Sequence, residues 1–233
     1  MTNNAPTATW ALRLHAGCDW VFWAMTMNFL WLIFTLAGGV IFGAAPATVA
    51  ASALTRRRLR GDKVASVREF AAEWRREFLR ANAVVAPPLL AAALLLAQVA
   101  LLFTAGSLAE PVGIATAIAA CLAFGLAAIV APLYVNYDLP LRSYLPTAWR
   151  WMLGNLAHTM LLLIAATAVI SASAFLPGLL PFVSIGAWPS LSPALCIGFF
   201  TANDRAVAER DAATSASAAS EHTVVRPQLS RVN

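Results

Sequence analysis

Charged residues are scarce in this 233-residue sequence: they make up 12% of it, whereas hydrophobic residues make up 60%. Soluble domains usually carry about 25% charged residues and about half apolar ones. The mean hydropathy of +0.71 points the same way. This composition excludes a disordered chain, a secreted disulfide scaffold and an ordinary soluble enzyme. It indicates an integral membrane protein.

Residues with catalytic or metal-binding chemistry are scarce too. The three cysteines, Cys18, Cys121 and Cys196, lie in separate segments without C-x-x-C spacing, so they predict no metal site. The sequence has no Walker loop, no G-x-S-x-G motif and no H-E-x-x-H motif. We therefore expect a protein that is not an enzyme and that binds no cofactor or metal.

Four long stretches contain no charged residue: 20–55, 81–109, 111–137 and 151–203. Because a helix needs roughly 20 apolar residues to cross a membrane, each of the two middle stretches holds one span. The last holds two, separated by the helix-breaking residues Pro177, Gly178 and Pro181. The sequence predicts an all-α, polytopic transmembrane helical bundle of five spans, with room for a sixth short one. The spans are expected at about residues 20–42, 83–104, 112–136, 156–176 and 182–202.

The first uncharged stretch is longer than one span, which leaves two topologies open for the N-terminal tail of residues 1–19. One full span over residues 21–42 would place that tail outside. A break at Gly38 and Gly39, followed by a return through residues 46–54, would place it inside. Pro46 suits the first turn of such a returning helix. Since about 12 residues are too few to span a membrane, we favour a short tilted or interfacial helix.

The basic residues predict the orientation. Nine of the sixteen Lys and Arg residues lie between Arg56 and Arg80, and short loops rich in Lys and Arg stay in the cytoplasm. Residues 55–80 and the C-terminus are therefore expected in the cytoplasm. Because these residues flank spans, we expect contact with the lipid bilayer and no nucleic acid. Residues 206–233, rich in Ala, Ser and Thr, are predicted to be a disordered cytoplasmic tail.

Two segments, at about residues 66–80 and 144–155, are predicted to be amphipathic helices that lie in the plane of the membrane. In the first, Ser66 and Glu69 form a capping box, and aromatic residues recur every four residues. Such helices anchor a protein at the interface or dock a partner. The candidate lipid- or partner-docking residues are Phe70, Trp74, Arg75, Phe78, Asn82, Trp149 and Arg150.

Polar and bend-forming residues inside the apolar stretches are candidate site positions, because such residues often have functional roles in membranes. Asn28 would bond between helices or contact a substrate, and His158 would pack between helices or relay protons. Tyr134 and Asn136 would shape a polar vestibule or belong to an aromatic belt. The full set is Asn28, Gly38, Gly39, Pro46, Thr48, Tyr134, Asn136 and His158.

Several motifs between residues 15 and 205 together resemble one family. The motifs are Asn28-Phe29-Leu30-Trp31-Leu32, Gly39, Gly43, Pro46-Ala47-Thr48, Phe70, Trp74-Arg75, Phe78, Asn82, Pro132-Leu133-Tyr134, Leu180-Pro181-Phe182 and Trp188. The sequence thereby resembles the YesL-like family of bacterial multi-pass membrane proteins, a domain of unknown function. The resemblance implies a bacterial inner-membrane location. It also implies an association with carbohydrate ABC transporters.

These observations lead us to expect a non-enzymatic accessory or regulatory component of a carbohydrate ABC transporter, with the permease or the ATPase as its partner. The alternative is a stand-alone small-solute transporter or channel that uses the broken helix at residues 38–48, because broken helices expose backbone groups to ligands. A third hypothesis is a homo-oligomer held together by small residues.

Overall fold

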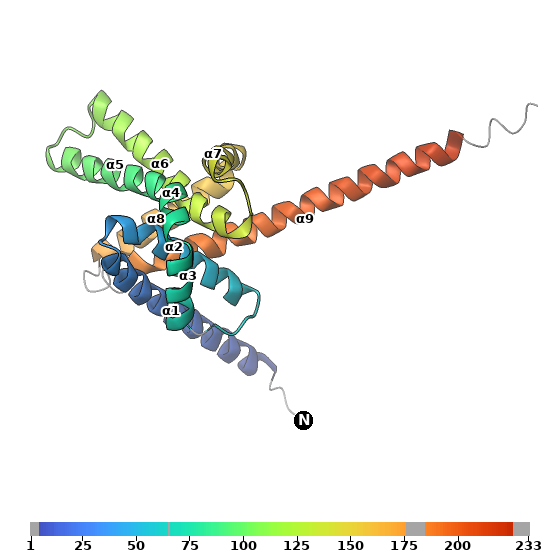
Figure 1. Ribbon diagram of the computed structural model, residues 1–233, viewed down its shortest axis with the longest axis horizontal. Coiled ribbons are helices and arrows are strands. Elements are labelled where there is room, and N and C mark those ends of the chain that lie inside the picture. The colour runs from blue at the N-terminus through green and yellow to red at the C-terminus, as the bar shows by residue number, and fades with distance from the viewer. Residues whose placement is uncertain (1–4, 65, 176–184, 226–233) are drawn as a thin grey trace, which may run out of the picture. The chain divides into compact units, whose positions relative to one another are not determined.

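The computed structural model describes the backbone of residues 5–64, 66–175 and 185–225, and the side chains of residues 14–64, 67–168 and 192–215 (Figure 1). Within these residues the chain is helical and contains no strand. The helices are α1 (Ala5–Ala37), α2 (Ile41–Leu59), α3 (Ser66–Arg76), α4 (Phe78–Val84), α5 (Ala86–Thr104), α6 (Pro111–Asn136), the 3-10 turn η1 (Leu141–Ser143), α7 (Tyr144–Gly154), α8 (Leu156–Phe175) and α9 (Ile185–Val225).

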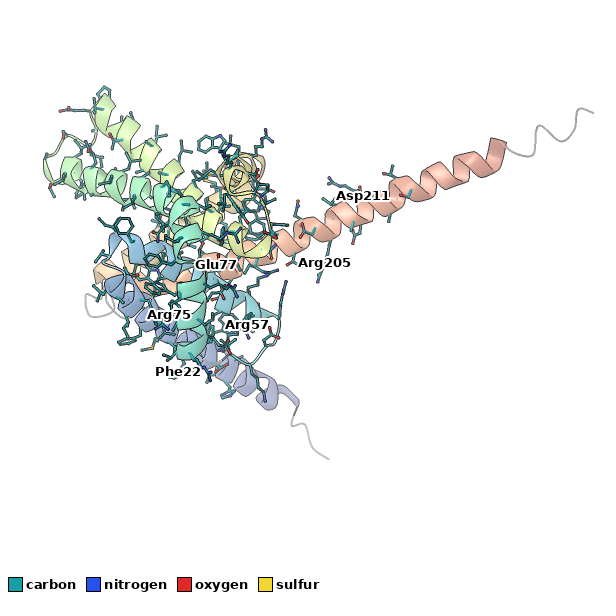
Figure 2. All side chains as sticks on the ribbon, in the orientation of Figure 1. Phe22, Arg57, Arg75, Glu77, Arg205 and Asp211 are labelled. Atoms are coloured by element: carbon teal, nitrogen blue, oxygen red, sulfur yellow. The ribbon has the colours of Figure 1, made fainter. Side chains whose placement is uncertain are left out.

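The chain divides into two compact units, residues 1–196 and residues 197–233. In the second unit α9 stays helical to Val225, and Arg205 and Asp211 on it are exposed (Figure 2). The sequence predicts disorder from residue 206, so the structure differs here. The segment contains many alanines, which have the highest helix propensity, and it has no Gly or Pro between residues 199 and 226. The disorder prediction considered only how little apolar surface this segment can bury.

Three helical segments among the described residues are long and apolar enough to cross a membrane: Leu14–Ala37, Ala86–Thr104 and Pro111–Asn136. They correspond to the first three predicted spans. A fourth is added if α7 and α8, which meet at 94°, form one broken span. The last predicted span, 182–202, begins outside the described residues. Five spans, and the position of the two short amphipathic helices in the membrane plane, therefore stay predictions.

Helix α1 begins at Ala5, so most of the predicted N-terminal tail of residues 1–19 is helical. Pro6 lies in its first turn, where a proline removes no helical hydrogen bond. After Pro6, no other proline interrupts α1.

The predicted break at Gly38 and Gly39 is a tight helical hairpin between α1 and α2. Gly39 has a positive φ of 74°, which reverses the chain at little cost for a glycine. A Cβ atom on Gly38 would overlap the Cα of Gly43, so the two helices touch through their backbones. The helix that follows has 19 residues and starts at Ile41. It is longer than the short helix predicted from Pro46 to Leu54.

Pro46 lies inside α2, not in its first turn as the sequence predicted. A proline has no backbone N–H, so it leaves the carbonyl four residues earlier without a helical donor. That carbonyl belongs to Phe42, and the side-chain Nδ2 of Asn82 donates to it at 2.9 Å. This replacement explains why α2 continues through its proline.

Helix α6 also contains an internal proline whose missing hydrogen bond is replaced by a side chain. Pro132 leaves the carbonyl of Ala128 without its helical donor. The hydroxyl of Ser192, which is buried, donates to that carbonyl at 2.8 Å. A side chain from a distant part of the sequence therefore supports each of these helices.

The core of the first unit includes a cluster formed by α1, α2 and α3. Its buried residues are Trp23, Met27, Leu30, Ala47, Ala50, Ala51, Leu54 and Phe70. The alanines of α2 let the backbones of α1 and α3 approach closely, as small residues do between membrane helices. Helices α5 and α6 form a second antiparallel hairpin, which turns at Gly106 with a φ of 72° (Figure 1).

Candidate functional site: an arginine-lined pocket

A polar pocket of about 540 Å³ lies where the ends of α2 and α6 meet the junction of α3 and α4. We call it the arginine pocket, because five arginines line it: Arg56, Arg57, Arg60, Arg76 and Arg80. The other polar residues of its lining are three acids, three tyrosines and one asparagine: Glu73, Glu77, Asp138, Tyr134, Tyr137, Tyr144 and Asn136. Arg57 on α2 and Glu77 at the α3–α4 junction are labelled in Figure 2.

Ion pairs and a hydrogen bond around Arg76 stabilise the wall of the pocket that α3 forms. The guanidinium of Arg76 forms ion pairs with Glu73 at 2.6 Å and with Glu77 at 3.1 Å. The hydroxyl of Tyr134 donates to the other carboxylate oxygen of Glu77 at 2.6 Å. This network joins α3 to the end of α6, and it occupies two of the three carboxylates in the pocket.

The two glutamates of this network have opposite pKa shifts. Burial raises the pKa of Glu73, and the nearby charge of Arg76 only partly opposes it. Burial by itself would also raise the pKa of Glu77, but hydrogen bonds from Tyr134 and Arg76 outweigh burial and lower it. The surroundings therefore favour the charged form of Glu77 and disfavour that of Glu73.

Hydrogen bonds also fix the opposite wall. The Nη1 of Arg56 donates to the carbonyl of Val135 at 2.5 Å. The hydroxyl of Tyr144 donates to the carbonyl of Tyr137 at 2.9 Å and accepts from the backbone N–H of Leu139 at 3.0 Å. These bonds set the path of the linker after α6, so both walls are positioned before any ligand binds.

The pocket has more positive groups than its carboxylates neutralise. The guanidinium groups of Arg60 and Arg80 form no ion pair with the described part of the chain. Burial, aided by the charge of Arg60, lowers the pKa of Arg56, but a guanidinium stays protonated in proteins. The buried Nε of Arg56 has no hydrogen-bond partner among the described residues. The arrangement therefore favours binding of an anion.

The pocket offers guanidinium and phenol donors, and its lining includes no histidine, cysteine, serine or lysine. Among the described residues, no group of three or more His, Cys, Asp or Glu side chains is placed to hold a metal ion. The chemistry that this lining supports is binding and orientation of a charged group.

Of the eight candidate positions predicted from the sequence, the structure brings two into the pocket: Tyr134 and Asn136. His158 lies apart from it, at the start of α8, where its ring stacks on Trp151 with 5.9 Å between centroids. Asn28 is fully buried in α1.

The other four predicted positions lie in the α1–α2 hairpin. Gly38 and Gly39 form the turn, and Pro46 lies in the middle of α2. The Oγ1 of Thr48 accepts from the indole Nε1 of Trp31 at 3.0 Å and donates to the carbonyl of Ala44 at 2.7 Å. The hydroxyl of Thr48 therefore acts as both an acceptor and a donor within the fold.

Three of the four aromatic residues predicted to dock lipid or a partner, Phe70, Trp74 and Phe78, have ring contacts within the chain. Phe70 is fully buried. Phe34 of α1 lies 5.1 Å from Phe70 and 5.5 Å from Trp74, between ring centroids, and Trp74 lies 4.9 Å from Phe78. Helix α1 therefore provides an apolar contact for Phe70 and Trp74. Docking of lipid or a partner by these residues stays a prediction.

The remaining predicted docking residues have different environments. Asn82 bonds to Phe42, as described above, and also donates to the carbonyl of Phe78 at 2.7 Å. Arg75, Trp149 and Arg150 are exposed. Of the seven residues, these three are therefore the ones whose side chains lie mainly on the surface.

Most residues of the arginine pocket were not among the candidate site residues predicted from the sequence. Arg56, Arg60 and Arg80 belong to the basic cluster, which we interpreted only as a signal of orientation. Glu73 and Glu77 lie in the predicted amphipathic helix at about residues 66–80, and neither was a candidate site residue. A usable signal was present, because these two carboxylates recur at a spacing of four on the same face as the arginines. No signal in the sequence pointed to Tyr144.

Comparison with known proteins places these observations in a family. Residues 24–99 match the family model described as "Protein of unknown function, DUF624". No solved structure matches the chain.

Three proteins of Bacillus subtilis (strain 168) are similar to this chain. The uncharacterized protein YesV is 39% identical over 72% of this chain and 82% of its own length. The uncharacterized protein YteU is 31% identical over 74% and 78%, and the uncharacterized protein YesL is 29% identical over 67% and 75%. The resemblance predicted from the sequence motifs is thereby confirmed: this chain belongs to the YesL-like DUF624 family.

Proposed function

We propose that this protein is a non-enzymatic membrane component that associates with a carbohydrate ABC transporter through the outer face of α3 and α4. This outer face consists of Arg68, Ala72, Arg75 and Leu79, which recur every three or four residues and are all exposed. The observation that carries the proposal is the division of α3 into two faces. Its aromatic stripe packs against α1, while the opposite face stays uncovered.

The outer face has the chemistry of an interface. Leu79 is 80% exposed, and the guanidinium groups of Arg68 and Arg75 form no ion pair with any residue that the structure describes. Arginine is enriched at protein interfaces, where its planar group binds carboxylates. The proposal therefore calls for an acidic, partly apolar surface on the permease or the ATPase.

Orientation and family add support. A segment this rich in arginine is expected on the cytoplasmic side, where a permease loop or an ATPase subunit can reach it. The link to carbohydrate uptake comes from the family resemblance, which implies that such proteins accompany sugar transporters. An accessory protein that only binds a transporter subunit needs no catalytic group. The proposal is therefore consistent with the expectation from the sequence that this protein is not an enzyme.

The proposal is tested by co-purification from the native membrane in mild detergent. The variant R68E/R75E reverses two charges on the outer face, and like charges facing each other cost several kcal/mol at an interface. We expect it to lose at least about tenfold of the co-purified permease or ATPase. The matched control R205E/R210E makes the same change at two exposed arginines of α9 and should retain the partner.

Two results would contradict the proposal. One is a wild-type protein that purifies with no transporter subunit. The other is solute flux into liposomes that contain only this protein, which would favour the stand-alone transporter. That alternative places its substrate at residues 38–48, where the structure has backbone contact between Gly38 and Gly43 and a carbonyl already bonded to Asn82.

A further inference from the structure

We infer that the arginine pocket is a binding site for the phosphate ester of a polyol, supplied by an anionic phospholipid headgroup or by a soluble polyol phosphate. The site lies between α2, α4 and the end of α6, and it is separate from the outer face proposed above. The inference therefore does not depend on the transporter partner.

The fold leaves several guanidinium donors available at the pocket. Arg60 and Arg80 are exposed at the pocket, and their guanidinium groups form no ion pair with a described residue. The Nε of Arg56 is buried and unpartnered, although its Nη1 is bonded to Val135. Guanidinium groups present a planar fork of donors that matches the oxygens of a phosphate. Three such groups around one pocket favour a phosphate over a single carboxylate.

The acidic groups of the pocket are placed so that they leave room for an anionic ligand. Glu73 and Glu77 are occupied by Arg76 and Tyr134, so they compete little with an anionic ligand. Asp138 forms no ion pair with a described residue and is exposed at the pocket. A carboxylate accepts hydrogen bonds from hydroxyl groups. A ligand with a phosphate at one end and hydroxyls at the other would satisfy both the arginines and Asp138.

The size of the pocket and its place at the end of a membrane-length helix also fit such a ligand. A volume of about 540 Å³ lies within the range of roughly 300–1,000 Å³ for small-molecule sites, and it leaves room for more than a bare phosphate. The pocket adjoins the end of α6, one of the three helices that can cross a membrane. Basic pockets at the ends of membrane helices bind lipid headgroups. Phosphatidylglycerol has both the phosphate and the hydroxyls that the pocket requires.

The experiment uses the full chain in phosphatidylcholine nanodiscs, with two probes. One arm titrates phosphatidylglycerol into the nanodiscs and counts retained lipids by native mass spectrometry. The other arm titrates soluble glycerol 3-phosphate by calorimetry. The variant R60Q/R80Q removes two guanidinium groups of the pocket, whereas R68Q/R75Q removes the same charge from the outer face and serves as the matched control. R60K/R80K keeps the charge and removes the fork, in case the glutamine variant does not fold.

We expect one of the two probes to bind the wild-type protein, with affinity about tenfold lower in R60Q/R80Q and unchanged in R68Q/R75Q. R60K/R80K should bind several-fold more weakly than the wild type. D138N should reduce the preference for glycerol 3-phosphate over inorganic phosphate. The probe that binds identifies the source of the phosphate. The inference is overturned if neither probe binds, or if the two glutamine variants lose affinity equally.

Discussion

The side-chain amide of Asn82 donates a hydrogen bond to the carbonyl of Phe42, the one backbone acceptor that Pro46 deprives of its helical donor. Asn82 lies on α4 and Phe42 on α2, so the bond holds two helices together while it repairs one of them. Both Pro46 and Asn82 are among the motif residues that carry the family resemblance. The bond gives a physical reason why the two residues occur in the same chain.

The first prediction concerns this bond. Asn82→Leu should destabilise the protein by about 1–2 kcal/mol, because a carbonyl loses its only replacement donor. In a Pro46→Ala background the backbone N–H of residue 46 returns, so the same change should cost clearly less. The difference is read from thermal unfolding in detergent as a double-mutant cycle.

Asn155 offers a control for the first prediction. Its amide donates to the carbonyl of Trp151, four residues earlier, as that of Asn82 does to Phe78. Asn155→Leu therefore removes the local bond alone and should show no coupling to Pro46→Ala. If Asn82→Leu costs the same with and without Pro46, the bond to Phe42 has no role in supporting α2.

The second prediction concerns the turn between α1 and α2. Gly38→Ala should destabilise the fold by about 2 kcal/mol or more, because the new Cβ meets the backbone of Gly43. Gly17→Ala is the matched control, since a Cβ there has nothing within 4 Å and alanine is the better helix former. That control should be neutral or stabilising. Equal unfolding temperatures of the two variants would contradict the tight hairpin.

The third prediction concerns Thr48. Thr48→Val removes the acceptor of the Trp31 indole N–H and should cost about 0.6–2 kcal/mol, the range of hydrogen bonds between membrane helices. Thr48→Ser keeps the hydroxyl and should recover most of that loss. The measurement is thermal unfolding monitored by tryptophan fluorescence. A serine variant as unstable as the valine variant would show that methyl packing, not the hydroxyl, is what matters.

The fourth prediction is a pH dependence. The pKa of Glu77 is lowered from its ordinary value of 4.5 by the bonds from Tyr134 and Arg76. The unfolded chain therefore binds a proton at higher pH than the folded one, and stability contributed by Glu77 is lost as the pH falls below 4.5 toward the lowered pKa. The difference in free energy of unfolding between the wild type and Glu77→Gln, measured as a function of pH, should become smaller as the pH falls through this range.

Glu73 provides the sign control for that measurement. Burial raises the pKa of Glu73 above its ordinary value of 4.5, so folding disfavours its charged form. As the pH falls from the raised pKa toward 4.5, protonation of Glu73 should therefore stabilise the folded state. Glu73→Gln should therefore alter the pH profile in the opposite direction to Glu77→Gln. Identical pH profiles for the two variants would be inconsistent with the different bonding of the two carboxylates.

Local features of the sequence predicted the helical class and the approximate limits of three membrane-length helices. The reason is that apolar length and helix propensity are properties of a continuous segment. The break at Gly38 and Gly39 was predicted for the same reason, since the conformational freedom of glycine acts at its own position. The helix predicted at about residues 144–155 is observed as α7, Tyr144–Gly154.

Only the tertiary structure decided which surfaces are internal. An amphipathic stripe such as Phe70, Trp74 and Phe78 requires an apolar neighbour, but it does not say whether that neighbour is lipid, a partner or another helix of the same chain. Here it is α1. The position of Pro46 inside α2 was equally undetermined, because its missing bond is replaced by Asn82 from another helix.

The arginine pocket was decided in the same way. The sequence by itself determined that many arginines lie near one end of the membrane helices, since charge is excluded from the apolar stretches. It did not determine that Arg56 bonds to the end of α6 or that Tyr134 bonds to Glu77. Those contacts join residues far apart in the chain. They exist only after α2, α3 and α6 have packed together, so the tertiary structure alone turns a basic segment into a site.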